Sequence, residues 1–502
     1  MANYFSNIEK IEKAVKEGEG FDYIIIVSSD KKQADFWQKR LSCFKKEIFG
    51  KNAEIISQYE DWGEGAGPVR TKSPKATAVP PMAKRTSNGA GQLLGTLYAF
   101  QKANQNKRLE NALKQGKSVA IYHTAGKGKR MAPLTFSEGG NKSAIRLPKI
   151  LKNGELFTIL EAVIFQTQVF AKTRPGRLCV FWGDQIIIPS ENFDFEQKCH
   201  GEIFGIKDRI PTQENIWKRD WQPYGLLALA QNTGPLQREK LSWEEFCKLK
   251  KSIDLKSLSK SLGFFSWSQE FLKALLGEFE NELREKNEKL DTDFHLWMPL
   301  TSTKEEFLER GGNGNYWERI DRFKKNLPIT FFRRSSEKCY NLVLDKDLGK
   351  DAFWWDFGQI SFYHKNLLKA LENSLEGKIM RRFFNIEKTK DSILVNSRVA
   401  GNIKNSLIIN SEVRDLKAEG AIIVNSKINN LISKNVLVYN LKDFKDLEIG
   451  SGTALCGMVL KDKRKIAIET HLKRDGKEDW EKRILDNPYS YKELETFLIQ
   501  DC

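Results

Sequence analysis

The sequence predicts a mixed α/β protein: a domain with a Rossmann-like mixed sheet, followed by a C-terminal parallel β-solenoid (β-helix). Three observations support this fold class. Residues 22–27 (DYIIIV) form a short apolar run that a polar turn and a helical pattern follow, as at the start of a doubly wound α/β unit. A second apolar run at 118–126 (SVAIYHTAG) ends in a glycine-rich turn. After residue 390, short β-rich pieces return at a nearly constant spacing, which is typical of a solenoid.

Strands and helices alternate in the first part of the chain. The first strand leads into a helix from about residue 31 (KKQADFWQKRL). Residues 63–89 are rich in glycine, proline and basic residues, so we expect a long loop there. We expect helices at about 91–114 and 156–172, and a strand at 177–184 (RLCVFWGD).

The middle of the chain, residues 190–330, is interpreted as an insertion-rich region. The apolar patch at 224–231 is typical of a strand, and the segment 268–290 is strongly helical. Trp and Phe are frequent here, and we interpret them as core residues first and as ligand-stacking residues second. Residues 351–374 begin with DAFWWDFG and continue as a helix. We therefore expect one domain over 1–385 that contains this region.

The solenoid prediction depends on a repeat in the sequence. Four positions follow one another at steps of 14, 15 and 14 residues: Asn396, Asn410, Asn425 and Tyr439. In a solenoid, alternate apolar side chains point inward and the asparagines bond from one coil to the next. An antiparallel meander is the alternative, but the Asn-Ser dipeptide returns in register. We place the solenoid at 386–469 and a helical tail at 470–502.

Composition narrows the class of protein. The 502 residues include 82 Lys and Arg against 66 Asp and Glu, a net charge of +16, and 40% are apolar, as in globular proteins. The charge fits nucleic acid, an anionic membrane, small anionic substrates or an ordinary Lys-rich surface. Without a helix-turn-helix pattern, RNP motif or zinc-finger spacing, no nucleic-acid partner is expected. No apolar run approaches the roughly 18 residues of a membrane span, so no membrane partner is expected either.

Cysteine and histidine content argues against a structural metal site. The seven cysteines are scattered without a CxxC pair, which excludes a zinc ribbon and predicts a reducing, cytoplasmic setting. The five histidines are too few for a His-rich site. The first residues, MANYFSNIEKIEKAV, lack the apolar region of a secretory signal.

The clearest chemical motif is the segment 123–135, HTAGKGKRMAPLT, which follows a predicted strand. Gly126 and Gly128 let the backbone approach an anion and present N–H groups to phosphate oxygens, and the basic residues after them add charge. The motif is not a P-loop, because the candidate at 140–143 lacks the spaced glycines. It is not a dinucleotide-binding GxGxxG either, because position 131 is Met.

This segment resembles the signature of sugar-1-phosphate nucleotidyltransferases, GGxGTRLxPLT followed by a lysine near a proline. The matching residues are Gly126, Gly128, Arg130, Pro133, Leu134 and Thr135, with Met131 in place of the leucine. Ala125 and Lys129 depart from the usual Gly and Thr.

Further segments resemble one branch of this superfamily, the L-fucose-1-phosphate guanylyltransferases. The similar segments are 21–41, 87–100, 141–151 and 181–189. The predicted solenoid also fits this branch, whereas a sugar-kinase domain, present in bifunctional members, is not expected in a chain of this length. The resemblance implies a catalytic domain over 1–385 that joins a nucleoside triphosphate, GTP as first choice, to a fucose-like sugar-1-phosphate and releases pyrophosphate.

The resemblance also implies which residues bind the triphosphate. Gly126, Gly128 and Arg130 would cradle the β and γ phosphates. Ala125 and Lys129 belong to the same loop.

Two lysines are candidates for binding the α-phosphate. Either Lys142 or Lys149 would bridge the α-phosphate and the sugar phosphate. Gly89 and Gly91 would let the backbone approach the base.

Two aspartates are implied as ligands of a Mg²⁺ cofactor. Asp184 ends the predicted strand at 177–184, where α/β sheets bind ligands. Asp356 lies in a segment similar to the WxDxGT motif of the same superfamily. Mg²⁺ takes one or two carboxylates plus substrate phosphates. A turn or helix cap is the alternative role for either aspartate.

Several alternatives stay open at this point. His123 is interpreted as capping the strand beneath the glycine loop rather than as catalytic. The basic loop at 70–85 either folds over the triphosphate or is a plain solvated loop. Rival functions are a UTP- or other NTP-dependent enzyme for another hexose- or heptose-1-phosphate, and a catalytically inactive nucleotide-binding or assembly protein. The solenoid is a candidate surface for homo-oligomers.

Overall fold

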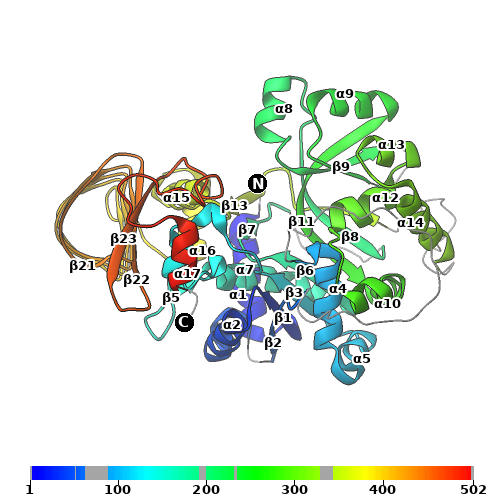
Figure 1. Cartoon of the computed structure of the whole chain (residues 1–502), viewed down its shortest axis with the longest axis horizontal. Coiled ribbons are helices and arrows are strands. Elements are labelled where there is room, and N and C mark those ends of the chain that lie inside the picture. Colours follow the sequence, from blue (N-terminus) through cyan, green and yellow to red (C-terminus); the bar gives the residue numbers. More distant parts are fainter. Residues whose placement is uncertain are drawn as a thin grey trace.

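The protein is described by a computed structural model, in which a region of parallel repeats lies at one end and the middle of the chain at the other (Figure 1). The described residues are 3–50, 52–62, 89–191, 199–230, 235–327 and 343–498. The basic loop predicted at 70–85 lies outside these ranges. Among the described residues no helix is both long and apolar enough to cross a membrane.

The N-terminal half is built on a mixed sheet with a parallel centre. Its parallel strands are β1 (Tyr23–Ser28), β2 (Glu54–Tyr59), β3 (Val119–His123) and β6 (Arg177–Trp182), in the order β2-β1-β3-β6. Strands β1 and β3 are almost wholly buried, as expected for parallel strands between two helical layers. The predicted α/β class with a parallel-rich sheet is confirmed.

Helices cover both faces of this sheet. Ile24 and Ile26 of β1 face one layer, whereas Ile25 and Val27 face the other. The first layer contains α1 (Tyr4–Glu17), α2 (Lys31–Cys43), α3 (Lys45–Ile48) and α7 (Ile159–Thr167). The second contains α4 (Gly91–Ala103) and α5 (Arg108–Lys114).

The single helix predicted at 91–114 is wrong, because α4 and α5 are separate. Asn104 ends α4, and its Oδ1 accepts the N–H groups of Leu109 and Glu110 at 2.9 and 3.1 Å. Asn106 and Lys107 between the helices have φ of 54° and 56°, which a continuous helix does not allow.

The middle region extends the same sheet instead of forming a separate one. Its strands are β8 (Gly201–Asp208), β9 (Gly225–Ala230), β10 (Leu236–Glu239), β11 (Leu255–Ser268) and β12 (Val343–Asp347). Strand β11 joins them to β6 by antiparallel pairing. The helices of this region are α8 (Glu214–Asp220), α9 (Trp243–Ser252), α10 (Gln269–Glu278), α11 (Glu280–Glu285), α12 (Met298–Thr301), α13 (Lys304–Glu309) and α14 (Gly314–Asn326).

Three predictions for this region can be checked directly. The strand expected at 224–231 is β9. The helix expected at 268–290 is wrong in length, since α10 and α11 replace it and Lys286, with a φ of 50°, ends α11. The aromatic residues are largely core, as predicted: Trp217 and Phe246 stack with ring centroids 4.0 Å apart in a buried cluster.

Short strands and helices surround the segments of the predicted site. They are β4 (Arg146–Ile150), β5 (Leu156–Thr158), β7 (Gln185–Ile188), β13 (Phe353–Asp356), α6 (Leu134–Ser137), α15 (Ile360–Leu368) and α16 (Leu375–Phe384). Strand β7 follows β6 directly and pairs antiparallel with β13. This pairing brings two segments together that are far apart in the sequence.

The C-terminal repeats form two parallel sheets. Strands β14 (Ile393–Val395), β16 (Leu407–Ile409), β18 (Ile422–Val424), β20 (Leu437–Tyr439) and β22 (Thr453–Val459) lie in one sheet. Strands β15 (Arg398–Lys404), β17 (Glu412–Glu419), β19 (Lys427–Lys434) and β21 (Lys442–Ile449) lie in the other. The chain therefore passes alternately between the two sheets, and the antiparallel meander is excluded for these strands.

A ladder of asparagine side chains links the repeats. Asn396, Asn410 and Asn425 each donate through Nδ2 to the next asparagine, at 2.8, 3.1 and 2.8 Å. The fourth member is Asn440, so the prediction of Tyr439 is wrong by one position. Asn440 shares the left-handed backbone of the other three, whereas the Tyr439 side chain points into the core.

The helical tail predicted at 470–502 is also largely wrong. Strand β23 (Lys465–His471) pairs antiparallel with β22, turns follow, and helix α17 covers only Tyr491–Leu498. Pro488 lacks the N–H group that a continuous helix needs, and Gly476 lowers helix propensity.

Candidate active site

The predicted site residues gather at the carboxyl edge of the parallel strands. Strands β1, β3 and β6 all end at this edge, and the strand order reverses between β1 and β3. Open α/β sheets bind ligands at such a switch point. The loops after β1 and β3 meet there, since the Gly126 N–H donates to Ser29 Oγ at 2.8 Å.

The two glycines of the loop serve different purposes. At Gly128, with φ of 58°, a Cβ atom would lie 2.7 Å from Lys142 Cβ and 2.9 Å from Thr135 Cγ2, so only glycine fits. At Gly126, with φ of 111°, a Cβ atom would meet nothing within 4 Å, and the residue is exposed. The loop is thus closely packed at Gly128 and open at Gly126, where the partly exposed Ala125 precedes it.

A lysine and a carboxylate form the first half of the charged cluster. Lys142 starts the short helix η3 (Lys142–Ala144), and its Nζ lies 2.9 Å from Asp184 Oδ2. Both side chains are mostly buried, with 16% and 13% of their surface exposed. Asp184 lies between β6 and β7, so the end of a central strand positions it.

Asp356 and Arg130 complete the cluster. Asp356 Oδ1 accepts the Gly358 N–H at 2.7 Å. A Cβ atom on Gly358 would lie 3.0 Å from Asp356 Oδ1, 3.5 Å from Asp184 Oδ2 and 3.7 Å from Arg130 Nη2. Three charged groups from three segments therefore converge beside one glycine.

Asp184 affects the titration of Asp356. Burial and the nearby Asp184 raise the pKa of Asp356 to about 6, although the Gly358 N–H, Arg130 and Lys142 act in the opposite direction. The cluster thus places two carboxylates beside two cations, Lys142 and Arg130, and burial is the main cause of the raised pKa.

Lys149 lies in a different environment from Lys142. Its Nζ lies 4.1 Å from the centre of the Phe165 ring and 5.2 Å from that of Phe157. Burial lowers its pKa to about 8, and the nearby charges are Glu12, Arg382 and Glu47 rather than those of the cluster. The structure brings Lys142, and not Lys149, to the two aspartates.

Gly89 precedes helix α4, and Gly91 is its first residue. At Gly91, with φ of 75°, a Cβ atom would lie 2.4 Å from the Leu290 carbonyl oxygen and 2.9 Å from Asp291 Oδ1. Asp291 Oδ1 accepts the Gln92 N–H at 3.1 Å. Gly91 therefore allows close contact with the middle region, which caps α4. The nearest group to a Cβ on Gly89 would be the Glu60 carboxylate, at 3.8 Å.

His123 lies beneath the glycine loop. It is buried, and its Nε2 lies 2.8 Å from Thr96 Oγ1 of α4. Burial and the Lys142 charge lower its pKa to about 4. The imidazole is therefore neutral near pH 7.

Lys129 and its neighbour Lys127 point to the C-terminal segment instead. Lys129 Nζ lies 4.5 Å from the centre of the Trp480 ring, and Lys127 Nζ lies 2.6 Å from Glu495 Oε1. The sequence reasoning did not include Trp480 or Glu495, and nothing in the sequence places 480–495 near the loop.

An aromatic pair near Asp356 was also not predicted from the sequence. The Tyr224 ring lies 4.7 Å from Trp354, two positions before Asp356 on β13. Burial and the Asp356 charge raise the pKa of Tyr224. The aromatic stretch FWWD was a signal for Trp354, but Tyr224 comes from the middle region.

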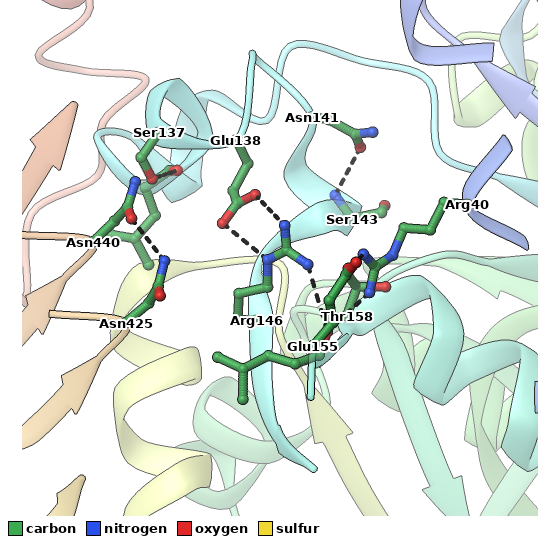
Figure 2. A network of polar contacts seen from close by, with 12 residues as sticks. Arg40, Ser137, Glu138, Asn141, Ser143, Arg146, Glu155, Thr158, Asn425 and Asn440 are labelled. Carbon is green, nitrogen blue, oxygen red and sulfur yellow. Dashed lines mark hydrogen bonds and ion pairs between the residues drawn. The ribbon is translucent and has the colours of Figure 1, made fainter. Parts of the chain in front are cut away.

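Polar contacts hold the segment around Lys142 (Figure 2). Asn141 Oδ1 accepts the Ser143 N–H at 3.3 Å. The Arg146 guanidinium pairs with Glu138 at 3.2 Å, and the Arg146 N–H donates to the Tyr439 hydroxyl at 2.9 Å. The repeat region therefore helps to fix the backbone on either side of Lys142.

Three buried polar atoms beside the loop have no hydrogen-bond partner among the described residues: Thr135 Oγ1, Asn141 Nδ2 and Ser143 Oγ. Buried polar groups in proteins are normally satisfied, so these atoms leave bonding capacity next to the cluster.

Of the predicted site residues, the structure brings Gly128, Arg130, Lys142, Asp184 and Asp356 together, whereas Gly126 contacts Ser29 of the loop after β1. Lys149 lies elsewhere, and the Lys129 ammonium is turned to Trp480. Neither models of known protein families nor curated proteins give a match to this sequence. The function is therefore inferred from the geometry of the site.

Proposed function

We propose that this chain is a sugar-1-phosphate nucleotidyltransferase, which transfers a nucleoside monophosphate from a nucleoside triphosphate to a sugar-1-phosphate. One observation carries the proposal: Arg130, Asp184 and Asp356 converge on Gly358 beside the glycine loop. Lys142 is paired with Asp184 in the same cluster. Phosphate transfer needs positioned positive charge and backbone N–H groups rather than covalent chemistry by the protein.

The proposed reaction is an in-line displacement. An oxygen of the sugar-1-phosphate attacks the α-phosphorus, and the bond from that phosphorus to pyrophosphate breaks. The nucleophile is already an anion, so no general base is needed, and the buried His123 has no part in the step. The backbone at Gly126 and Gly128 and the Arg130 guanidinium cradle the β and γ phosphates. Lys142 bridges the α-phosphate and the sugar phosphate.

Asp184 and Asp356 fit a Mg²⁺ ion. Their carboxylates lie beside the same glycine, and carboxylate oxygens are ligands that Mg²⁺ takes in proteins. No group of three or more His, Cys, Asp or Glu side chains that could hold a metal is found in the described ranges. Mg²⁺ does not need one, because substrate phosphates and water complete its shell. When bound, the ion neutralises and orients the phosphates.

For the substrates, the resemblance favours GTP and a fucose-like sugar-1-phosphate. A matrix of the four NTPs against a panel of sugar-1-phosphates, with Mg²⁺ and a pyrophosphate-release readout, tests this. We expect one pair to react fastest, with GTP as the nucleotide. Turnover with UTP or another NTP alone would replace GTP and keep the reaction class.

A catalytically inactive nucleotide-binding or assembly protein is the second candidate. It is favoured by the departures at Ala125 and Lys129, the latter held by Trp480 rather than by the cluster. No turnover across the whole matrix, together with measurable NTP binding, would support this candidate. Retention on DNA at physiological ionic strength would instead support a nucleic-acid partner, which we do not expect.

We further propose that the two parallel sheets form a β-solenoid, since the chain alternates between them and the Asn ladder runs through four repeats. This region is the candidate surface for a homo-oligomer. The cysteines Cys43, Cys179, Cys199, Cys247 and Cys456 are free thiols, in agreement with a cytoplasmic enzyme.

A further inference from the structure

The C-terminal segment 472–498 packs directly on the glycine loop. At Gly476 a Cβ atom would lie 2.3 Å from the Lys129 carbonyl oxygen and 3.2 Å from Ala132 Cβ. Gly476 has no left-handed φ, so close approach to the loop is what requires glycine there. Any larger residue would displace the backbone between Lys129 and Ala132.

Trp480 holds the same stretch of the loop through its ring. It is 6% exposed, and its ring centre lies 4.5 Å from Lys129 Nζ and 5.7 Å from the centre of Phe136. Tyr491 of α17 packs on Phe136 as well, with ring centres 5.9 Å apart. A cation over a tryptophan ring is attracted by the ring's electrons, and more strongly when water is excluded.

The fold of the segment itself presents Trp480. Asp479 accepts two bonds from the Arg474 guanidinium, at 2.6 and 2.8 Å, which close the turn around Gly476. The Lys492 N–H donates to the Trp480 carbonyl at 2.8 Å and joins this turn to α17.

The basic side chains near Trp480 point in two directions. Lys127 and Lys129 are held by Glu495 and Trp480, whereas Arg130 lies beside Gly358. Because Arg130 follows Lys129 directly, a shift of the backbone at Lys129 would move Arg130 as well.

We propose that Gly476 and Trp480 are positioning residues, which hold residues 127–132 so that Arg130 and the loop N–H groups are preorganised for the triphosphate. This inference rests on the proposed function for its kinetic consequence. Misplacing a positioned group by about 1 Å costs on the order of 100-fold in rate. Partial loosening of one contact should cost less.

The test compares Trp480→Ala with Trp480→Phe and with the control Tyr489→Ala. Tyr489 belongs to the same segment, but its ring packs on Phe497. For Trp480→Ala we expect the KM for the NTP to rise about 10-fold, with kcat and the KM for the sugar-1-phosphate changed less than about 3-fold. Phe keeps a ring beneath the Lys129 ammonium, so Trp480→Phe should restore most of the affinity. Tyr489→Ala should leave all three constants as in the wild type.

Hydrogen exchange separates this inference from the proposed function. In Trp480→Ala the amides of 126–132 should exchange at least about 10-fold faster, while those of β1 and β3 stay protected. This result is expected even if the wild type turns over no substrate pair. Unchanged exchange in 126–132 would overturn the inference, and so would faster exchange with an unchanged KM in an active enzyme. If Trp480→Ala does not fold, Glu495→Gln tests the neighbouring Lys127 contact, with a rise in loop exchange supporting the inference and no rise overturning it.

Discussion

The charged cluster and the asparagine ladder are two polar regions built in opposite ways. In the ladder, Asn410 and Asn425 each accept a bond from the asparagine before them and donate one to the asparagine after. In the cluster, two carboxylates face each other with an exposed arginine beside them, and three nearby buried polar atoms lack partners among the described residues. The inner asparagines of the ladder are bonded on both sides, whereas polar atoms beside the cluster lack partners in the described part of the chain. Under the proposed function, this difference separates residues that stabilise the fold from residues that serve a ligand.

The largest expected effect separates the two candidate lysines. Lys142→Ala should lower turnover by on the order of 100-fold or more, because a positioned charge at the reacting phosphates is lost. Lys149→Ala should change turnover less than about 3-fold, since its ammonium packs on Phe157 and Phe165. Pyrophosphate release by the two variants gives the comparison. Equal losses in both would remove the distinction between the two sites.

Substitutions in the ladder should have the opposite effect: they should lower the free energy of unfolding and leave turnover unchanged. Asn425→Ala removes two side-chain hydrogen bonds and places Ala at a φ of 49°. We expect the free energy of unfolding to fall by about 2–3 kcal/mol, with turnover at 25 °C unchanged.

Two other variants control this result. Asn425→Gly tolerates the left-handed backbone and should recover about 1 kcal/mol. Asn396→Ala, at the exposed end of the ladder, should cost less than Asn425→Ala because it removes one bond. A large loss of turnover in folded Asn425→Ala would mean that the ladder also serves the site.

The smallest expected effect concerns the pH dependence of stability at Lys149. Its pKa is lowered to about 8 in the folded protein, below the ordinary value of 10.5, so the unfolded chain binds more protons between these two pH values. Lys149 therefore destabilises the fold below about pH 8, and this penalty disappears as the pH rises toward 10.5. Lys149→Met should raise the free energy of unfolding at pH 7 by on the order of 1–2 kcal/mol. Denaturant unfolding at pH 7 and pH 10 measures this, and a gain that is the same at both would contradict it.

Sequence reasoning was most accurate where a local pattern decides the structure. The apolar runs at β1, β3 and β6 and the Asn repeat each depend on neighbouring residues, and the structure has strands at all of them. Prediction from the sequence failed where contacts between residues far apart in the chain determine the structure. No sequence pattern near Gly91 predicts its contact with Leu290, and none near Lys149 predicts its contact with the Phe165 ring.

The same limit applies to the break between α4 and α5 and to the asparagine ladder. The separation of α4 from α5 depends on one side chain, Asn104, that caps the following helix. The shift from Tyr439 to Asn440 in the ladder follows from an inward-facing tyrosine whose hydroxyl bonds to Glu138 at 2.6 Å. Contacts of this kind join positions about 300 residues apart, so a pattern along the chain does not contain them.

The most direct test of the central claim is the rate of pyrophosphate release by the wild type and by Asp184→Ala, measured with Mg²⁺ and the best substrate pair. Asp184 contacts Lys142 and flanks Gly358 with Asp356, so its loss should disable the cluster while the Asn ladder keeps the repeats folded. We expect a rate at least about 100-fold lower in Asp184→Ala, with thermal unfolding close to that of the wild type. A folded Asp184→Ala that releases pyrophosphate at nearly the wild-type rate would contradict the claim.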